Sequence, residues 1–354
     1  MAVLNDEQEM LRDMAREWTR NEHPVSAWRS VRDSGEPFDA EAWGAMGEMG
    51  WAGIVIPEEH GGTDFGWLSL GLVVEEMGKT LAASPLIASA LAASAIVLGG
   101  SEEQKSSYLP RLATGDLIGT LAFDEGPRHT GLEASTSVHN GRLTGTKAFV
   151  HEASRAGLFV VLAQDGVYLV EKGKGISLSK RHLADMRDHA EVDFNDAPAQ
   201  KLADGGSDLA QKILDRARVL TAAEMLGMCQ AVFDTTLDYL KQRVQFNQVL
   251  SSFQALQHRM ADLYTELELT RSAVEGGLQA IDTGFAVTEA GLLAKARAND
   301  ALHLISKEGV QLHGGIGMTD EYDVGFYLKR ARVLEAAWGS SGHLRDAYAS
   351  MKAY

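Results

Sequence analysis

The sequence holds very few cysteines and prolines. Cys229 is the only cysteine among 354 residues, which excludes an intramolecular disulfide and a zinc site built from several thiolates. It lies inside an apolar run, so we expect a buried, unreactive thiol in a reducing compartment. Only 7 prolines interrupt a chain rich in Ala, Leu, Met, Glu, Gln and Lys, and this composition predicts a mainly helical protein.

Positive charge and long apolar runs are also scarce. The chain carries 33 Lys and Arg residues against 49 Asp and Glu residues, a net charge of -16 that acts against non-specific binding of nucleic acid or anionic lipid. An anionic ligand must therefore meet a local basic site. No run approaches about 18 consecutive apolar residues, and the acidic, amphipathic start of the chain lacks the pattern of a secretory signal. We expect a soluble, cytoplasmic protein.

The spacing of apolar residues changes twice along the chain. From Asn5 to about Gly115 it is helical, with breaks near residues 35–37, 57–66 and 99–101. Residues 117–204 instead form short β-type runs, and Asn140-Gly141 and Asp165-Gly166 between them are strong hairpin signals because type I′ turns need positive φ. This block predicts an antiparallel sheet or barrel.

Helical spacing returns after Leu209, with segments expected at 209–247, 251–283, 286–313 and 322–351. Consecutive blocks of helix, strand and helix indicate an α+β fold that is mainly helical. The predicted domains are an N-terminal helical domain, a central small β-barrel and a C-terminal four-helix bundle, at residues 1–116, 117–206 and 207–354.

Two short segments could bind an anionic ligand. Arg243 and Phe246 stand three residues apart near a predicted helix end, where the guanidinium could hold a phosphate through a bidentate fork. The alternative is a surface arginine beside a packing phenylalanine. The glycines of residues 311–317 (QLHGGIG) allow close backbone approach to a ligand and offer amide donors, although such clusters also end helices.

Several motifs in the same order resemble those of the acyl-CoA dehydrogenase family. They are GWAGIVIPEEHGG and GSEEQKSSYLPRLATGDLIGTLAF in the first block, NGRLTGTKAFV in the middle, and RVQFNQVLSSFQALQHRMADLY and QLHGGIGMTDEYDVGFYLKRAR in the last. The resemblance covers nearly the whole chain. It implies a helical domain, a small β-barrel and a four-helix bundle that bind FAD at a subunit interface.

The implied reaction is oxidation of an acyl-CoA thioester to the trans-2-enoyl-CoA, by removal of the alpha proton and transfer of a beta hydride to flavin. An electron-transfer flavoprotein would reoxidise the flavin, and the chain would work as a homo- or hetero-oligomer. The resemblance assigns contacts with FAD from a neighbouring subunit to Arg243 and Phe246, with Asn247 in place of the family's glycine. It assigns further cofactor contacts to Gln311, Gly314 and Gly315.

The family's flavin-facing segment is altered in this chain. Where most members have Trp-Ile-Thr or Trp-Ile-Ser after a lysine, the chain has Phe149, Val150 and His151 after Lys147-Ala148. The resemblance places Phe149 and His151 against the flavin. The loop at residues 124–129 (DEGPRH) also departs from the family's Thr-Glu-Pro turn, as in the bacterial branch that acts on steroid side-chain CoA esters.

Both positions at which the family carries its catalytic base lack an acid. Trp338 occupies the position of the glutamate in the common Tyr-Glu-Gly, and Ala217, before Arg218, occupies the position used by a minority of members. Glu224 lies seven residues after Ala217 on nearly the same helix face, among apolar residues, so we predict that it is the base. The alternative is a Glu224 paired with a cation on a neighbouring helix, or facing water. Glu335 is close to Trp338 in sequence, but nearby basic residues favour a surface ion pair.

These observations leave three hypotheses for function. The first is an FAD-dependent acyl-CoA dehydrogenase subunit of the divergent branch. The second is a non-catalytic partner that completes the FAD site of an active paralogue through Arg243 and Gln311. The third, a related flavoenzyme such as a nitroalkane oxidase, normally needs an aspartate at the base position, which this chain lacks.

Overall fold

The computed structural model describes residues 3–354, and these residues form two compact units. The first comprises the described residues up to Ser26 together with Gly71–Ala82 and Arg218–Tyr354, and the second comprises Ala27–Leu70 and Ala83–Ala217. Helices α2 (Val25–Ser34), α4 (Trp67–Thr80) and α7 (Ser207–Gln242) contribute residues to both. The three predicted domains, which divide the chain at other positions, remain a prediction.

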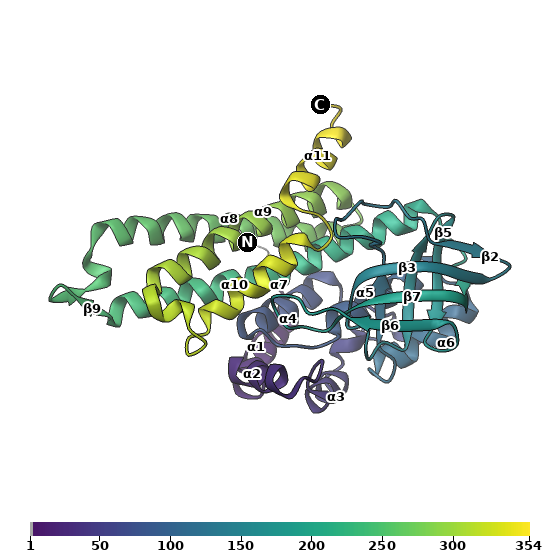
Figure 1. The fold of residues 1–354 in the computed structure, drawn as a ribbon, viewed down its shortest axis with the longest axis horizontal. Helices are drawn as coiled ribbons and strands as arrows, with labels where there is room; N and C mark the ends of the chain where they lie inside the picture. Colours follow the sequence, from purple (N-terminus) through teal and green to yellow (C-terminus); the bar gives the residue numbers. More distant parts are fainter. Residues whose placement is uncertain (1–2) are drawn as a thin grey trace. The chain divides into compact units, whose positions relative to one another are not determined.

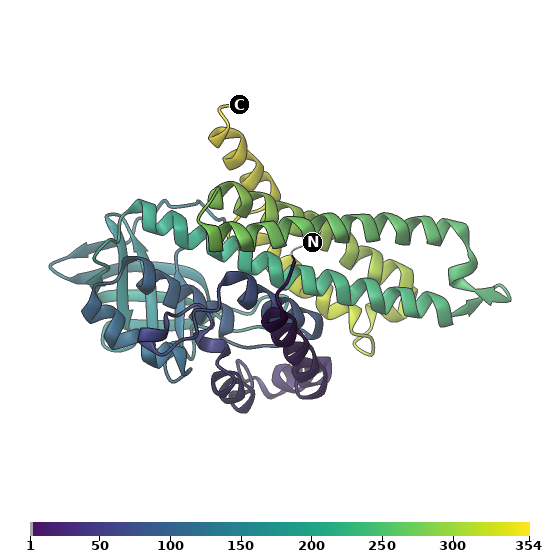
Figure 2. The same cartoon turned by 180° about the vertical axis from the view of Figure 1, so that it is seen from behind.

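The first unit is helical. Besides its parts of α4 and α7 it holds α1 (Asp6–Asn21), α8 (Gln254–Thr283), α9 (Val287–His313), α10 (Val324–Ala336) and α11 (Ser341–Met351), with the short helices η3 (Leu250–Ser252) and η4 (Gly314–Met318). The long helices α7, α8 and α9 lie side by side (Figure 1, Figure 2). Cys229 is free and fully buried on α7, and burial raises the pKa of its thiol, as an unreactive core cysteine requires.

Two of the four predicted C-terminal segments end differently from the prediction. The segment expected at 209–247 leaves the helix at Gln242 and continues as a two-residue hairpin, β9 (Val244–Gln245) and β10 (Gln248–Val249). The segment expected as one helix at 322–351 is broken between α10 and α11. The break occurs because Trp338 and Gly339 adopt positive φ values of 59° and 118°, which no α-helix accommodates.

The second unit combines helices with two four-stranded sheets. Its helices are α3 (Ala40–Glu48), α5 (Leu86–Gly99), α6 (Glu102–Ala113), η1 (Trp51–Gly53) and η2 (Glu58–His60), besides most of α2 and parts of α4 and α7. Its strands are β1 (Gly119–Ala122), β2 (Ser137–His139), β3 (Arg142–His151), β4 (Leu158–Ala163), β5 (Gly166–Glu171), β6 (Ile176–Lys180), β7 (His189–Pro198) and β8 (Gln200–Lys201).

The strand orders are β1-β4-β5-β8 and β2-β3-β7-β6. The predicted β block therefore forms two separate hydrogen-bonded sheets. Phe159 of one sheet packs edge-on against Phe194 of the other in a shared apolar core. Both predicted hairpins are present, and Asn140 and Gly141 adopt φ values of 50° and 71°. The prediction for this block was an antiparallel sheet or barrel, and it is wrong for β1 and β4, which pair in parallel.

Within residues 3–354, no helix combines the length and the apolar composition that a membrane crossing would require.

Candidate functional site

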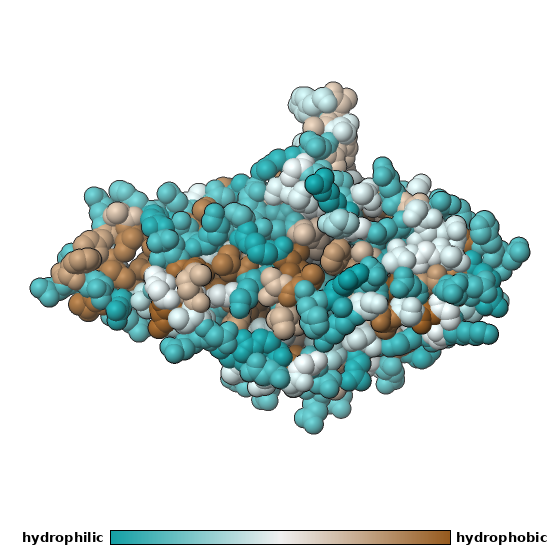
Figure 3. Space-filling model, in the orientation of Figure 1, coloured by the Kyte–Doolittle hydropathy of each residue, from teal (hydrophilic) through white to brown (hydrophobic). Residues whose placement is uncertain are grey.

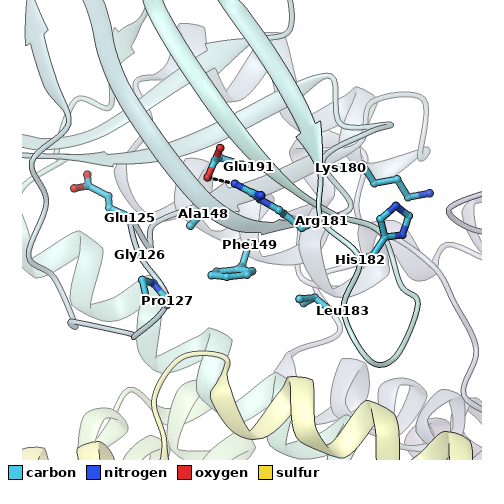
Figure 4. A pocket seen from close by; sticks show the side chains of 10 residues that line it. All are labelled: Glu125, Gly126, Pro127, Ala148, Phe149, Lys180, Arg181, His182, Leu183 and Glu191. Atoms are coloured by element: carbon cyan, nitrogen blue, oxygen red, sulfur yellow. Dashed lines mark hydrogen bonds and ion pairs between the residues drawn. The ribbon is translucent and has the colours of Figure 1, made fainter.

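A cavity of about 600 Å³ opens in the second unit, and the predicted residue Phe149 lies in it (Figure 4). Four segments line it: the loop after β1, strand β3, the end of β6 with the loop that follows it, and strand β7. The lining residues are Glu125, Gly126, Pro127, Ala148, Phe149, Lys180, Arg181, His182, Leu183 and Glu191. The lining thus combines one aromatic ring with the basic side chains of residues 180–182 and two carboxylates.

A β-bulge in β3 presents Phe149 to this cavity. The register between β3 and β7 shifts between Lys147 and Val150, and Phe149 adopts a left-handed φ of 52°. An extra residue in one strand re-aims a side chain and ends local pairing, which is a common device beside binding sites. A non-glycine residue with this φ persists only where its surroundings hold it in place.

A partly buried ion pair holds that bulge. Lys147 is fully buried, and its Nζ donates to Glu125 Oε1 at 2.7 Å and to the Phe123 carbonyl at 3.0 Å. Burial alone would raise the pKa of the Glu125 carboxyl, but hydrogen bonds from Lys147, Ser135 and Thr136 outweigh it and hold the pKa well below its usual range. Sequence reasoning assigned no role to this pair, although a lysine at a core-facing strand position needs an anion nearby.

His151, the other predicted flavin contact on β3, is not among the residues that line the cavity. Its ring instead packs edge-on against His189 at 4.5 Å, and its carbonyl accepts a hydrogen bond of 2.6 Å from Thr120. The structure therefore brings Phe149 to the cavity and leaves His151 packed beside it. The assignment of His151 to the flavin remains a prediction from the resemblance.

Arg243 and Phe246 lie at the hairpin that ends α7. Phe246 and Asn247 occupy the two turn positions with φ values of 54° and 62°, the left-handed pair of a type I′ turn. Asparagine is among the non-glycine residues that adopt this region most readily, so Asn247 can stand where the resemblance expects glycine. Arg243 is exposed and Phe246 is 86% exposed, and hydrophobic surface is visible at this end of the bundle (Figure 3).

The glycine segment lies at the same end of the bundle. The ring of Tyr239, one turn before Arg243, stacks on His313 at 4.4 Å, which joins the end of α7 to the end of α9. Gly314 ends α9 with a φ of 66°, as the alternative of a helix C-cap requires. Gly314, Gly315 and Gln311 are exposed, and a Cβ added at either glycine would meet no atom within 4 Å. This backbone is open to a ligand or a second chain.

Glu224 forms a buried ion pair with Arg330 of α10. Arg330 Nε lies 2.9 Å from Glu224 Oε1 and Nη2 lies 3.1 Å from Oε2, while the two residues are 7% and 9% exposed. The backbones of α4 and α7 also approach closely at this position, since a Cβ on Gly78 would lie 2.3 Å from the Glu224 carbonyl oxygen. Glu224 is thus a carboxylate paired with a cation on a neighbouring helix.

Trp338 lies in a turn held by buried polar side chains. Arg218 Nε donates to the Trp338 carbonyl at 3.1 Å, and Asn299 Nδ2 donates to the Gly339 carbonyl at 3.2 Å. Lys295, fully buried, donates to Asn299 Oδ1 at 2.5 Å and to the Leu334 carbonyl at 2.9 Å. Polar side chains thus hold the backbone of this turn through the Trp338 and Gly339 carbonyls. Sequence reasoning did not assign Lys295 or Asn299.

Glu224 and the Trp338 turn lie at different levels along α7. Arg218, which contacts the Trp338 turn, precedes Glu224 by six residues on α7, or about 9 Å of helix rise. Glu335 also has a partner, Arg332 Nη1 at 3.0 Å, so the ion pair expected for it is present, although both side chains are partly buried.

Lys295 gives a test of the network that holds the Trp338 turn. Burial lowers the pKa of Lys295 to about 7, against an attraction to Glu335 that acts to raise it. Between about pH 7 and 10 the unfolded chain therefore binds more protons than the folded chain, and stability from this group rises with pH by about 1 kcal/mol per unit. Lys295→Met should flatten the rise measured by denaturant unfolding. The control Lys307→Met, an exposed position on the same helix, should retain the rise of stability with pH. Identical slopes of stability against pH in the two variants would contradict a lowered pKa at Lys295.

Two family models match the chain. The "Acyl-CoA dehydrogenase, N-terminal domain" matches residues 5–116, and the "Acyl-CoA dehydrogenase, C-terminal domain" matches residues 204–351. The chain belongs to the acyl-CoA dehydrogenase family. The recognition made from the sequence motifs is therefore confirmed, and the mainly helical α+β fold agrees with that of solved family members.

Curated relatives align over nearly the whole chain. An acryloyl-CoA reductase (NADH) of Anaerotignum propionicum is 32% identical over 96% of this chain and 92% of its own length. The acyl-CoA dehydrogenase IpdE2 of Mycolicibacterium smegmatis is 32% identical over 93% of each chain.

Among solved structures, the Tcur3481-Tcur3483 steroid ACAD G363A variant superposes with a TM-score of 0.91 at 28% identity over 98% of both chains. The ChsE4-ChsE5 complex of Mycobacterium tuberculosis superposes with a TM-score of 0.91 at 26% identity over all of both chains.

Proposed function

We propose that this chain is a subunit of an FAD-dependent acyl-CoA dehydrogenase that oxidises an acyl-CoA thioester to its trans-2-enoyl product. Two surfaces of the chain, each suited to a part of the same cofactor, carry the proposal. One is the cavity that contains Phe149, and the other is the bundle end that exposes Arg243, Phe246 and the glycines at 314 and 315.

The residues present fit FAD. Phe149 offers an aromatic face for a planar ring, while Arg243 offers a charge-assisted contact for a diphosphate, which a chain of net charge -16 needs locally. The open space over Gly314 and Gly315 leaves their backbone approachable. Bound FAD would supply the two-electron acceptor for oxidation of a carbon-carbon single bond.

We assign Phe149 to packing on the flavin ring and Lys147 with Glu125 to holding its bulge. Arg243, Phe246, Gln311, Gly314 and Gly315 would hold the nucleotide part of FAD across a subunit interface, as the resemblance implies. His151 keeps its proposed place beside the flavin, and an electron-transfer flavoprotein is the proposed oxidant. The acyl group could be a fatty acid or a steroid side chain, the latter supported by the relative described as a steroid ACAD.

Glu224 remains the proposed base for the alpha proton only if its pair with Arg330 opens. The pair, together with Trp338 and Ala217 at the family's two base positions, favours a second candidate function, that of a partner subunit which completes the site of an active paralogue. Coexpression with a neighbouring acyl-CoA dehydrogenase gene should then give a mixed complex more active than either chain alone. A flavin-loaded homo-oligomer with turnover typical of the family would exclude that candidate.

Replacement of Arg243 by alanine tests the cofactor assignment. Loss of a charge-assisted contact should weaken flavin retention by about 1.5–3 kcal/mol, or roughly tenfold to a hundredfold. Flavin content after extensive dialysis measures this, with the exposed Lys241→Ala on α7 as a matched control. Equal flavin content in the Arg243 variant and the control would remove Arg243 from the site.

A further inference from the structure

The loop after β1 carries a histidine paired with an aspartate. His129 Nδ1 lies 2.7 Å from Asp124 Oδ1, and the His129 side chain is 2% exposed. Because Nδ1 faces the carboxylate, the proton of a neutral ring is assigned to Nδ1, and Nε2 is the nitrogen that gains a second proton. A carboxylate beside an imidazole stabilises the protonated ring. The pair is therefore a place where the protein can take up a proton at a fixed position.

Contacts of the loop place this pair at the wall of the cavity that contains Phe149. The Asp124 carbonyl accepts a hydrogen bond of 2.8 Å from the backbone N–H of Ala148, which lines the cavity. Gly126 and Pro127 stand between the two members of the pair in the sequence, and both line the cavity on one side of the Phe149 ring (Figure 4). A change of charge in the pair therefore acts at short range on a ligand in the cavity.

The start of the loop is firmly held. Glu125, which follows Asp124, accepts hydrogen bonds from Ser135 N at 2.7 Å, from Thr136 N at 2.9 Å and from Lys147 Nζ at 2.7 Å. These bonds tie the loop to β3 and to the segment before β2. The pair is thus held in place before a ligand arrives, and a preorganised charge does not have to reorganise when the charge of the ligand changes.

The other charged groups of the loop and of the cavity wall are paired or keep their charge near neutral pH. They are the pairs Glu125–Lys147 and Glu191–Arg181 and the exposed cations Arg128 and Lys180. His182 also lines the cavity, and a histidine changes charge between about pH 5 and 8. It is exposed, however, whereas the His129 side chain is buried. Because water screens an exposed charge, His129 is better placed to act on a ligand in the cavity.

We propose that the Asp124–His129 pair sets the reduction potential of the flavin bound in this cavity, because His129 takes up a proton when the flavin is reduced. The inference rests on the proposed function, which places the flavin ring on Phe149. A hydride carries two electrons from the acyl-CoA to the cofactor, and a separate proton passes from water to Nε2 of His129. The cation formed there stabilises the more negative, reduced form of the ligand and so raises its potential.

The reduction potential of the bound flavin, measured against pH by equilibration with a redox dye, tests this inference. His129→Gln keeps an amide that can donate to Asp124, but it takes up no proton near neutral pH. One extra proton for two electrons changes the equilibrium constant of reduction tenfold per pH unit, or about 30 mV. Between about pH 7 and 8 the wild-type potential should therefore fall about 30 mV per pH unit more steeply than that of His129→Gln. The two potentials should converge near about pH 9, where His129 is neutral in both redox states.

Two further variants separate this role from a purely structural one. Asp124→Asn leaves the imidazole in place and removes the charge that favours its protonated form, so it should move the steep region to lower pH. A pair that only holds the loop would leave that region where it is. His139→Gln, an exposed position at the end of β2, should give the potentials of the wild type at every pH.

A flavin-loaded His129→Gln variant with the potentials of the wild type would overturn the inference. Loss of the extra slope in His182→Gln instead would also overturn it, because the exposed histidine would then be the group that takes up the proton. If His129→Gln does not retain flavin, Asp124→Asn decides, and an unchanged curve in that variant overturns the inference. Flavin binding by the wild type with either result leaves the proposed function intact, whereas a wild type that binds no flavin removes both.

Discussion

Replacing Trp338 with glutamate is expected to speed reduction of the bound flavin by an acyl-CoA about 100-fold or more. Trp338 stands where the resemblance places the family's glutamate, and Arg218 and Asn299 hold the turn through the carbonyls of Trp338 and Gly339. These contacts do not involve the side chain at 338, so a smaller acidic residue can take its place with the turn retained. Anaerobic stopped-flow absorbance of the flavin measures the rate.

Trp338→Gln is the matched control, since glutamine has the size and shape of glutamate without a basic carboxylate. It should bind flavin as well as the glutamate variant and gain no rate. A folded, flavin-loaded glutamate variant that reduces no faster than its glutamine counterpart would show that position 338 does not face the reacting carbon. The base position inferred from the resemblance would then be wrong for this chain.

Replacing Glu224 with glutamine is expected to lower the free energy of unfolding by about 3 kcal/mol. The change leaves the Arg330 guanidinium, which is 9% exposed, without its bidentate carboxylate in the helical unit. Removing one member of a buried pair costs more than removing both, because the remaining charge stays desolvated. Urea unfolding followed by circular dichroism measures the loss.

The double variant Glu224→Gln/Arg330→Met completes the test. It should recover most of the lost stability, since no unpaired charge remains. If Glu224→Gln instead keeps its stability and slows flavin reduction by about 100-fold, Glu224 is the base and its contact with Arg330 is secondary. A loss of stability thus identifies Glu224 as half of a structural ion pair, whereas a loss of flavin reduction rate identifies it as the base.

Features specified by neighbouring residues were predictable from the sequence. Asn140-Gly141 predicts a type I′ hairpin because both residues tolerate positive φ, and the structure contains this hairpin between β2 and β3. The seven-residue spacing of Ala217 and Glu224 predicts that both lie on nearly the same face of one helix, and both are buried on α7. Such patterns depend only on the local geometry of helices and turns.

Features set by distant partners were not predictable in this way. The parallel pairing of β1 with β4 joins strands separated by a long stretch of chain, and no local pattern encodes it. The partner of Glu224 is 106 positions away on another helix, so an acid in an apolar helix could equally have been a base or half of an ion pair. The break at Trp338 was missed because tryptophan is not a turn-forming residue, and tertiary hydrogen bonds hold it at positive φ.

The visible spectrum of the purified protein, alone and copurified with a partner subunit, shows directly whether the chain is a flavin-dependent dehydrogenase subunit when acyl-CoA thioesters from short chains to steroid side chains are added anaerobically. We expect bound flavin in at least one of the two preparations, and we expect at least one thioester to bleach it. Absence of flavin from both preparations, or flavin that no thioester bleaches, would contradict the assignment as a dehydrogenase subunit.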